Sequence, residues 1–321
     1  MLLKLNKQLE KRMPLITPTS VVLGVLLTTY LSPLSFLVPW IFAFITFSGA
    51  LSSNFKSLQR AIMHPFPILI ALVTLHLIMP AWAWMVGNLT FPGDSLTVTG
   101  LILAVVIPTG ITSFIWVSMK SGNIALTLSI ILVDTLISPF VVPYSLTLFV
   151  GSNVDMDILN IIKGLLFMVV LPSILGMLLN HVTKGNVTSK IGPSLAPFSK
   201  IGLGIVVMIN SAEVAPYLQN VNWKLVETGA VVFFIAFCGY LFSWGIGHLM
   251  KLGKEEIIAL VFTGGMRNIS AGAVIAVTFF PAEVAVPVVV GMLFQQVLAS
   301  IYGYMIQRTY SIETLQQKHT A

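Results

Sequence analysis

The sequence is poor in charged residues. Only 9% of its 321 residues are Asp, Glu, Lys or Arg, whereas 56% are hydrophobic. An ordinary soluble domain carries about 25% charged residues, so this composition cannot cover a surface that faces water. We therefore expect an integral membrane protein that contacts lipid. The net charge of +6 is no sign of a nucleic-acid partner, because the basic residues stand between the apolar runs.

Cysteine and the usual hydrolase motifs are also scarce. Cys238 is the single cysteine, which excludes a disulfide framework and a thiolate metal site. The sequence has no HExxH, no GxSxG and no pair of aspartates within apolar runs. A metallo-, serine or aspartyl hydrolase would lack its minimum parts. We expect no enzyme activity, cofactor or bound metal, and no protein partner is predicted.

Apolar runs of about 20 residues, the length of a membrane helix, fill the chain. Ten spans are predicted, at roughly residues 14–31, 34–52, 66–86, 97–118, 122–149, 158–180, 196–216, 225–249, 255–280 and 283–307. The connections are short, and no soluble domain is inserted. The sequence thus predicts an all-α membrane protein with ten transmembrane helices.

Charged residues between the spans predict the orientation. One set of loops and termini is basic, and it holds Lys4, Lys7, Lys11, Arg12, Lys56, Arg60, Lys120, Lys184, Lys190, Lys251, Lys254, Arg308 and Lys318. The alternate loops hold Asp94, Asp155, Asp157 and Glu213, with Lys224 as the main basic exception. Cytoplasmic loops are rich in Lys and Arg, so both termini are predicted to be cytoplasmic.

Two spans are interrupted near their middle. The fourth carries IPTGITSF at 107–114, and the ninth carries TGGMRN at 263–268. Each is the fourth span of a five-span half, and five is odd, so the second half would enter the membrane inverted. Matched breaks of this kind indicate a transporter site between inverted repeats. We expect repeats over 1–157 and 158–321, with the helices broken close to Gly110 and to Gly264–Gly265.

The breaks concentrate groups that could bind an ion or a substrate. Half-helix N-termini favour an anion, whereas unwound carbonyls favour a cation. A single Ser or Thr in a membrane helix is more often satisfied by its own backbone, but a cluster at two matched breaks favours a site. The polar residues of that cluster are Thr109, Thr112, Ser113, Thr263, Asn268 and Ser270.

Arg267 and Asp134 are the charges placed deep in the predicted membrane. A cation at this depth costs at least about 2.5–3.5 kcal/mol, so Arg267 must face protein or water, and it is too far from either helix end to snorkel. We expect Asp134 as its partner, either as a structural ion pair or inside a transport site. Thr127, Ile131 and Asp134 share one helix face. His76, mid-span, could titrate near neutral pH or could be buried and neutral.

The chain resembles the bile acid:sodium symporter family in its bacterial ten-helix form. The motifs PTGITSF at 108–114, SGNIALTLS at 121–129 and GGMRN at 264–268 carry this resemblance, which extends over nearly the whole sequence. It implies a panel domain from spans 1, 2, 6 and 7, and a core domain from spans 3, 4, 5, 8, 9 and 10 with broken helices crossed. It also implies a protein of the bacterial inner membrane that carries bile-acid- or pantoate-like anions by alternating access, usually with two Na⁺.

The sequence departs from the family pattern where the family binds sodium. Phe114 stands where the span-4 break usually has Asn. The span-5 hydroxyl pair appears as Thr127 and Ile131, so one hydroxyl is missing. Thr263 stands at the position of a Glu in span 9. Most side-chain oxygens that would hold the ion are therefore lost.

Two further departures concern charge. Arg267 occupies the position of a span-9 Gln, and His76 that of a span-3 Gln that reaches the second sodium ion. A guanidinium stays charged at any relevant pH, so Arg267 could take the place of Na⁺. The sequence favours a secondary transporter of small organic anions in which Arg267 replaces Na⁺. Na⁺-coupled symport through residual ligands and backbone carbonyls is the alternative, and a channel or a sensor on the same fold is a third possibility.

Overall fold

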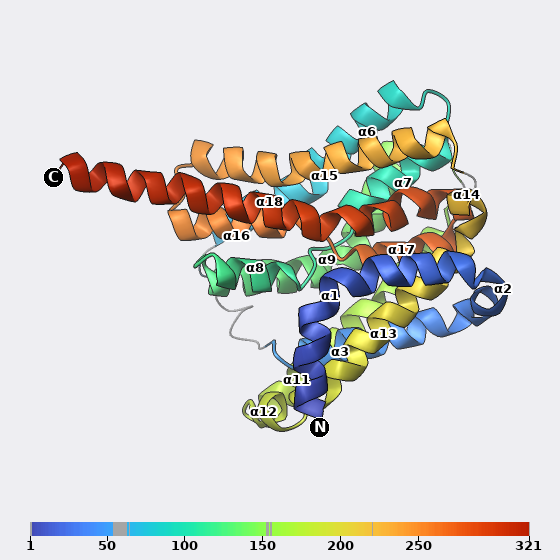
Figure 1. The fold of residues 1–321 in the computed structure, drawn as a ribbon, viewed down its shortest axis with the longest axis horizontal. Helices are drawn as coiled ribbons and strands as arrows, with labels where there is room; N and C mark the ends of the chain where they lie inside the picture. The colour runs from blue at the N-terminus through green and yellow to red at the C-terminus, as the bar shows by residue number, and fades with distance from the viewer. Residues whose placement is uncertain are drawn as a thin grey trace.

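The computed structural model describes residues 2–53, 63, 65–151, 154, 156–219 and 221–320. The described residues form helices joined by short connections, together with one isolated bridge between extended segments (Figure 1). Three residues used above for the orientation lie outside the described part: Lys56, Arg60 and Asp155.

Helices follow one another closely through the first half of the chain. They are α1 (Leu2–Leu26), α2 (Thr28–Leu31), η1 (Ser32–Leu37), α3 (Val38–Ala50), α5 (Pro65–Val73), η2 (Thr74–Ile78), α6 (Met79–Thr90), α7 (Ser95–Val106), α8 (Ser113–Met119) and α9 (Ile124–Val150). The segment η2 is a single π-helical turn between α5 and α6. Such turns are rare in proteins, and those that occur often lie at functional sites.

The second half is also helical. Its elements are α10 (Ile158–Leu165), η4 (Leu166–Val170), α11 (Leu171–Val182), α12 (Asn186–Lys190), α13 (Gly192–Glu213), α14 (Ala215–Gln219), α15 (Trp223–Leu249), α16 (Lys254–Gly265), α17 (Ile269–Phe279) and α18 (Ala282–Thr320). The last helix continues well past the predicted end of the tenth span at 307, and Figure 1 shows it extending beyond the bundle.

Seven helical segments of the described part are long and apolar enough to cross a membrane. They are Thr28–Ala50, Pro65–Thr90, Ile124–Val150, Ile158–Val182, Gly192–Glu213, Trp223–Leu249 and Ala282–Tyr310. The helices α7, α8, α16 and α17 have 12, 7, 12 and 11 residues, fewer than the roughly 20 that a bilayer needs. The prediction of an all-α membrane protein is confirmed, while the ten-span inverted repeat stays a prediction.

The helices pack as two groups. In one group α1 lies against α13, and α3 contacts both α11 and α13. In the other, α7 packs against α6 and α18, and α15 packs against α16 and α18. Figure 1 shows the first group on one side of the bundle and α15, α16 and α18 on the other. The interrupted helices therefore belong to the second group, and α17 also touches α13 and α3 of the first.

Candidate functional site

The two interrupted segments meet at their extended residues. Thr109 and Arg267 form an isolated antiparallel bridge. The Gly110 amide donates to the Met266 carbonyl at 3.1 Å, and the Asn268 amide donates to the Pro108 carbonyl at 2.8 Å. Each break thus supplies hydrogen-bond partners that the other has lost by leaving the helix, as buried backbone groups require.

The second break lies slightly later than the glycine pair indicated. Helix α16 continues through Gly264 and Gly265, and the unwound residues are 266–268. The two glycines instead allow close packing on α15, because a Cβ on Gly265 would overlap the ring of Tyr240, and one on Gly264 would overlap Ser243. Small residues at a close helix–helix contact are typical of membrane proteins.

Thr109 is fixed by both its hydroxyl and its backbone amide. Its Oγ1 donates to the Thr263 carbonyl at 3.0 Å, which joins the first break to the last turn of α16. Its amide donates to Oδ2 of Asp134 on α9 at 2.7 Å. A buried carboxylate therefore holds the backbone of the first break in place.

Asp134 pairs with His76 and not with Arg267, so the predicted ion pair is wrong. Nε2 of His76 lies 2.6 Å from Oδ1 of Asp134. Within the described residues no ion pair joins Asp134 to Arg267, and Nη1 and Nη2 of Arg267 have no hydrogen-bond partner. The helix packing instead brings η2 and the first break next to α9, so the two carboxylate oxygens contact His76 and the Thr109 amide.

Arg267 is a buried cation next to two cavities. The residue is 5% exposed, and its backbone amide donates to Oε1 of Gln295 on α18 at 3.0 Å. Both residues line a cavity of about 220 Å³ and a smaller one of about 40 Å³, which Tyr240 also lines. Buried donors without an acceptor are costly, so this guanidinium marks a place where an anion would be stabilised.

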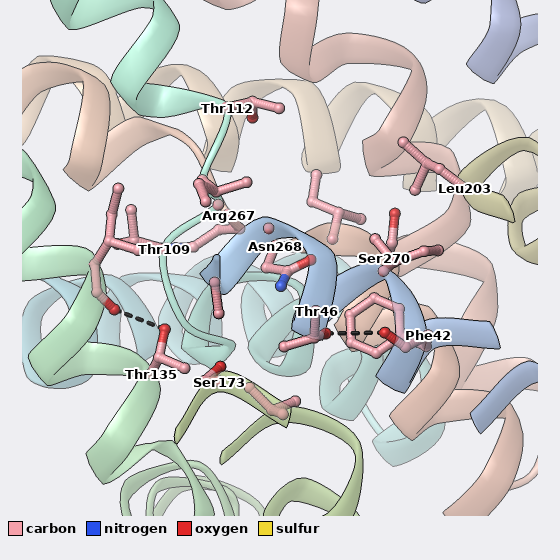
Figure 2. Close-up of a pocket in the computed structure, with 18 of the residues that line it drawn as sticks. Phe42, Thr46, Thr109, Thr112, Thr135, Ser173, Leu203, Arg267, Asn268 and Ser270 are labelled. Atoms are coloured by element: carbon pink, nitrogen blue, oxygen red, sulfur yellow. Dashed lines mark hydrogen bonds between the residues drawn. The ribbon is translucent and has the colours of Figure 1, made fainter. Parts of the chain in front are cut away.

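The larger cavity lies between the two helix groups. Figure 2 shows side chains from both groups around it, such as Phe42 of α3 and Arg267 of the second break. Thr109, Thr112, Arg267 and Asn268, four of the five residues predicted to bind substrate, line it, and Ser270 lines it as well. Ser113, the fifth, lines none of the cavities described here. Its side chain is fully buried in α8, and its Oγ has no partner among the described residues.

Some polar residues at this cavity were not predicted. Thr46 and Ser173 reach it from α3 and α11, and Thr135 reaches it from α9 (Figure 2). The Thr135 hydroxyl donates to the Ile131 carbonyl at 2.6 Å, and that of Thr46 to the Phe42 carbonyl at 2.9 Å. Sequence spacing carried no signal for Thr46 or Ser173, because their place depends on which helices pack together.

The positions that were predicted to correspond to sodium ligands offer few free oxygens. The Thr127 hydroxyl donates to the Asn123 carbonyl at 2.9 Å, and the Thr263 hydroxyl donates to the Ala259 carbonyl at 2.8 Å. Ile131 lines the larger cavity with an apolar side chain, and Phe114 is half-buried in α8. Both hydroxyls are thus engaged by their own helices.

The Asn268 side chain completes the second break. It caps α17, and its Oδ1 accepts from the Ala271 amide at 3.4 Å. The free amide groups at the start of α17 carry partial positive charge, which favours a bound anion. Arg267 and the start of α17 therefore present positive charge to the same cavity wall.

A multi-pass helical protein with paired helix breaks at an internal cavity has the form of a secondary transporter. Residues 39–221 match the family model described as Sodium Bile acid symporter family. This match covers more than half of the chain, and the chain belongs to that family. It is therefore a membrane transporter and not an enzyme, and the family prediction is confirmed.

Three relatives are similar to most of the chain. The chain is 56% identical to "Uncharacterized protein YbaS" of Bacillus subtilis (strain 168), over 95% of this chain and 100% of the relative. It is 26% identical to "Uncharacterized sodium-dependent transporter YocS" of the same organism, over 78% of this chain and 79% of the relative. It is 25% identical to "Probable sodium/metabolite cotransporter BASS3, chloroplastic" of Oryza sativa subsp. japonica, over 81% of this chain and 62% of the relative.

Proposed function

We propose that this transporter moves a small organic anion by alternating access, with the fixed charge of Arg267 in place of a bound sodium ion. The observation that carries the proposal is the guanidinium of Arg267, which is buried at the helix breaks with no partner for Nη1 and Nη2 among the described residues. Asp134 interacts electrostatically with this charge but accepts no hydrogen bond from it, so both guanidinium nitrogens still lack an acceptor. The oxygens of a carboxylate in the 220 Å³ cavity would supply one.

The substrate would be a bile-acid- or pantoate-like carboxylate that binds beside both breaks. Thr112 and Asn268 offer a hydroxyl and an amide at the cavity wall, and α17 begins there. Apolar residues such as Phe42 and Met292 line other parts of the cavity and suit a carbon skeleton. A mostly apolar pocket with a few orienting polar groups is the usual form of a small-molecule site.

The proposed architecture is the ten-span fold with repeats over 1–157 and 158–321. The packing of α1, α3, α11 and α13 as one group supports a panel domain from spans 1, 2, 6 and 7. The other spans would form the core domain, and the cavity would open alternately to either side as the two domains move. Basic loops support cytoplasmic termini in the inner membrane of a bacterium.

Sodium-coupled symport is the second candidate. The printed names of two relatives favour it, since one is called sodium-dependent and the other a sodium/metabolite cotransporter. In this chain sodium would be held by residual ligands such as Thr127 and Thr263 and by backbone carbonyls of the breaks. The engagement of both hydroxyls by their own helices weighs against it.

Uptake into proteoliposomes tests the two candidates. Labelled monocarboxylates, with pantoate and pyruvate among them, would be presented in sodium, potassium and choline buffers at equal pH. We expect saturable uptake at equal rates in the three buffers, and none in protein-free liposomes. Steep dependence on Na⁺ that is lost in Thr263→Val would favour the sodium-coupled alternative. Absence of uptake for every acid would contradict the proposed function, and a substrate-independent ion current would favour a channel.

A further inference from the structure

The pair formed by His76 and Asp134 lies directly behind the wall of the larger cavity. The Asp134 side chain is fully buried, and that of His76 is 9% exposed. One carboxylate oxygen lies 2.6 Å from Nε2 of His76, and the other accepts from the Thr109 amide at 2.7 Å. Two donors stabilise the ionised carboxylate. The same carboxylate therefore contacts an imidazole and the backbone of a residue that lines the cavity.

His76 has one ring nitrogen in use and one free. Its Nδ1 is buried and has no hydrogen-bond partner among the described residues. With Nε2 bonded to a carboxylate, the neutral ring carries its proton on Nε2 and leaves a lone pair on Nδ1. That lone pair can accept one proton, and the neighbouring carboxylate would stabilise the resulting imidazolium.

Few ionisable groups surround His76. The turn η2 packs against α5, α6, α7 and α9. Within these helices the ionisable side chains are Asp134 and Tyr144, both of α9, and Tyr144 is 64% exposed. Asp94 caps the distant start of α7. Arg267, at the breaks, interacts electrostatically with Asp134. Of these side chains His76 is the imidazole, and its free ring nitrogen can accept a proton.

The charges of His76, Asp134 and Arg267 add up to zero only while the cavity holds no anion. With neutral His76, the negative charge of Asp134 and the positive charge of Arg267 cancel. A carboxylate that enters beside Arg267 adds a negative charge to the interior, and an uncompensated buried charge is strongly unfavourable. A proton on Nδ1 of His76 restores neutrality.

We propose that His76, held by Asp134, is the binding site of a co-transported proton, with one proton carried per monocarboxylate. The proton comes from water on one side of the membrane, binds Nδ1 while the anion occupies the cavity, and leaves to water on the other side. No other bond forms or breaks. Asp134 links the two events, because it contacts both the titrating ring and the Thr109 amide.

This proposal depends on the proposed function, and the wild-type protein tests it through the charge that is moved. Labelled pantoate would be added to proteoliposomes under a pH gradient, alkaline inside, or under a potassium-diffusion potential. One-to-one coupling with H⁺ is electroneutral, so we expect the pH gradient to drive accumulation at least tenfold above equilibrium uptake and the potential to have no effect. Uptake that follows an inside-positive potential and ignores the pH gradient would overturn the proposal while leaving anion transport intact.

Binding measurements give a second readout. Because the anion-bound form holds one more proton than the free form, pantoate affinity should fall as the pH rises, by up to about tenfold per pH unit. Isothermal titration in buffers of different ionisation enthalpy should also report uptake of one proton per bound pantoate. No proton uptake and a flat affinity between pH 6 and 9 would contradict the proposal.

Substitution of the ring gives the third readout. His76→Gln keeps a hydrogen-bond donor for Asp134 but cannot titrate, so we expect accumulation driven by the pH gradient to be lost and potential-driven uptake to appear. His248→Gln is the matched control, because this histidine is exposed on α15 and bonds Trp244 at 2.9 Å. Wild-type coupling in His76→Gln would overturn the proposal. If His76→Gln does not fold, the comparison of the pH gradient with the membrane potential in the wild-type protein still tests the proposal.

Discussion

Thr109 and Arg267 face each other across an antiparallel bridge. The Thr109 hydroxyl also donates to the carbonyl of Thr263, a residue 154 positions later in the sequence. This pairing makes one unit of two helix breaks that come from different halves of the chain. Arg267 is tied on its other side, since its amide donates to Gln295 of α18. Contacts to the first break, to α16 and to α18 therefore hold the backbone around the fixed charge.

Gly110 is the position where this unit tolerates no side chain. A Cβ there would lie 2.7 Å from the Arg267 carbonyl oxygen, so Gly110→Ala must separate the two breaks. We expect a loss of stability of about 1–3 kcal/mol, the usual range for overpacking, and loss of substrate uptake. Thermal unfolding in detergent and uptake in proteoliposomes would measure the two effects.

Gly245 provides the matched control for that substitution. It lies in α15, and a Cβ added at this residue would meet no atom within 4 Å. Gly245→Ala should leave uptake unchanged and leave stability equal or slightly higher, because alanine favours a helix by up to about 1 kcal/mol. Equal behaviour of the two alanine variants would show that the contact between the breaks is not critical.

The sequence identified the breaks because glycine, proline and polar residues inside an apolar run are visible without a structure. It placed the second break too early, since Gly264 and Gly265 serve packing on Tyr240 and Ser243 rather than unwinding. It also identified Thr112 and Asn268 at a common cavity, because both lie at the breaks.

The partner of Asp134 could not be predicted in the same way. Hydropathy shows which charges lie deep in the membrane, but it does not show which helix faces meet. Arg267 was expected beside Asp134, whereas the structure places His76 there, 58 residues away in the sequence. The π-turn that carries His76 leaves no signal in the hydrophobic pattern. Pairing between helices is set by packing, which a single sequence does not encode in readable form.

Asn268 should have separable effects on folding and on binding. Its Oδ1 caps α17, so Asn268→Ala loses the cap, about 1 kcal/mol, together with a polar contact to the substrate. Asn268→Asp keeps a capping oxygen but adds a negative charge at the cavity wall. We expect Asn268→Asp to be as stable as wild type and to lose carboxylate affinity at least tenfold.

Affinity and thermal unfolding of the two Asn268 variants would be compared in the same detergent. The alanine variant should lose both stability and affinity, the latter by about 1–3 kcal/mol, the range for removal of a buried polar partner. Unchanged carboxylate affinity in both variants, or tighter binding of a cation, would contradict an anion site at this wall.

Asp94 and Lys224, at the starts of α7 and α15, offer a test of stability against pH. Burial alone raises the pKa of Asp94, but the Lys224 ammonium, 2.6 Å away, and Thr97 outweigh it and lower the pKa below its ordinary value of 3.8. A lowered carboxyl pKa gives stability that is fully present above pH 3.8 and is lost as the pH falls through the lowered value. Because the Lys224 side chain is 57% exposed, solvent screens the pair.

A double-mutant cycle with Asp94→Asn and Lys224→Gln would measure that pair. Asparagine can still cap α7, so the cycle isolates the charge interaction. We expect a coupling energy of about 0.2–1 kcal/mol at pH 7 that decreases in high salt and vanishes at low pH. A coupling that persists after Asp94 is protonated would show that the interaction is not electrostatic.

The charge of Arg267 should determine whether uptake needs Na⁺. If the guanidinium takes the place of sodium, Arg267→Gln removes the cation from a buried site whose other charge, Asp134, remains. Uptake should then fall at least tenfold in potassium or choline buffer, because the anion loses its counter-charge. Restoration by Na⁺ would follow if glutamine and the carbonyls of residues 266–268 can coordinate the ion. Arg267→Lys keeps the charge but not the planar fork, so it should retain more activity than Arg267→Gln and gain no sodium dependence.

Uptake by the wild type, Arg267→Gln and Arg267→Lys in sodium and choline buffers at fixed pH would test the role of the Arg267 charge. Wild-type uptake by Arg267→Gln in both buffers would leave Arg267 with a structural role alone. Sodium dependence in the wild type would instead mean that the carbonyls build an ion site beside the guanidinium.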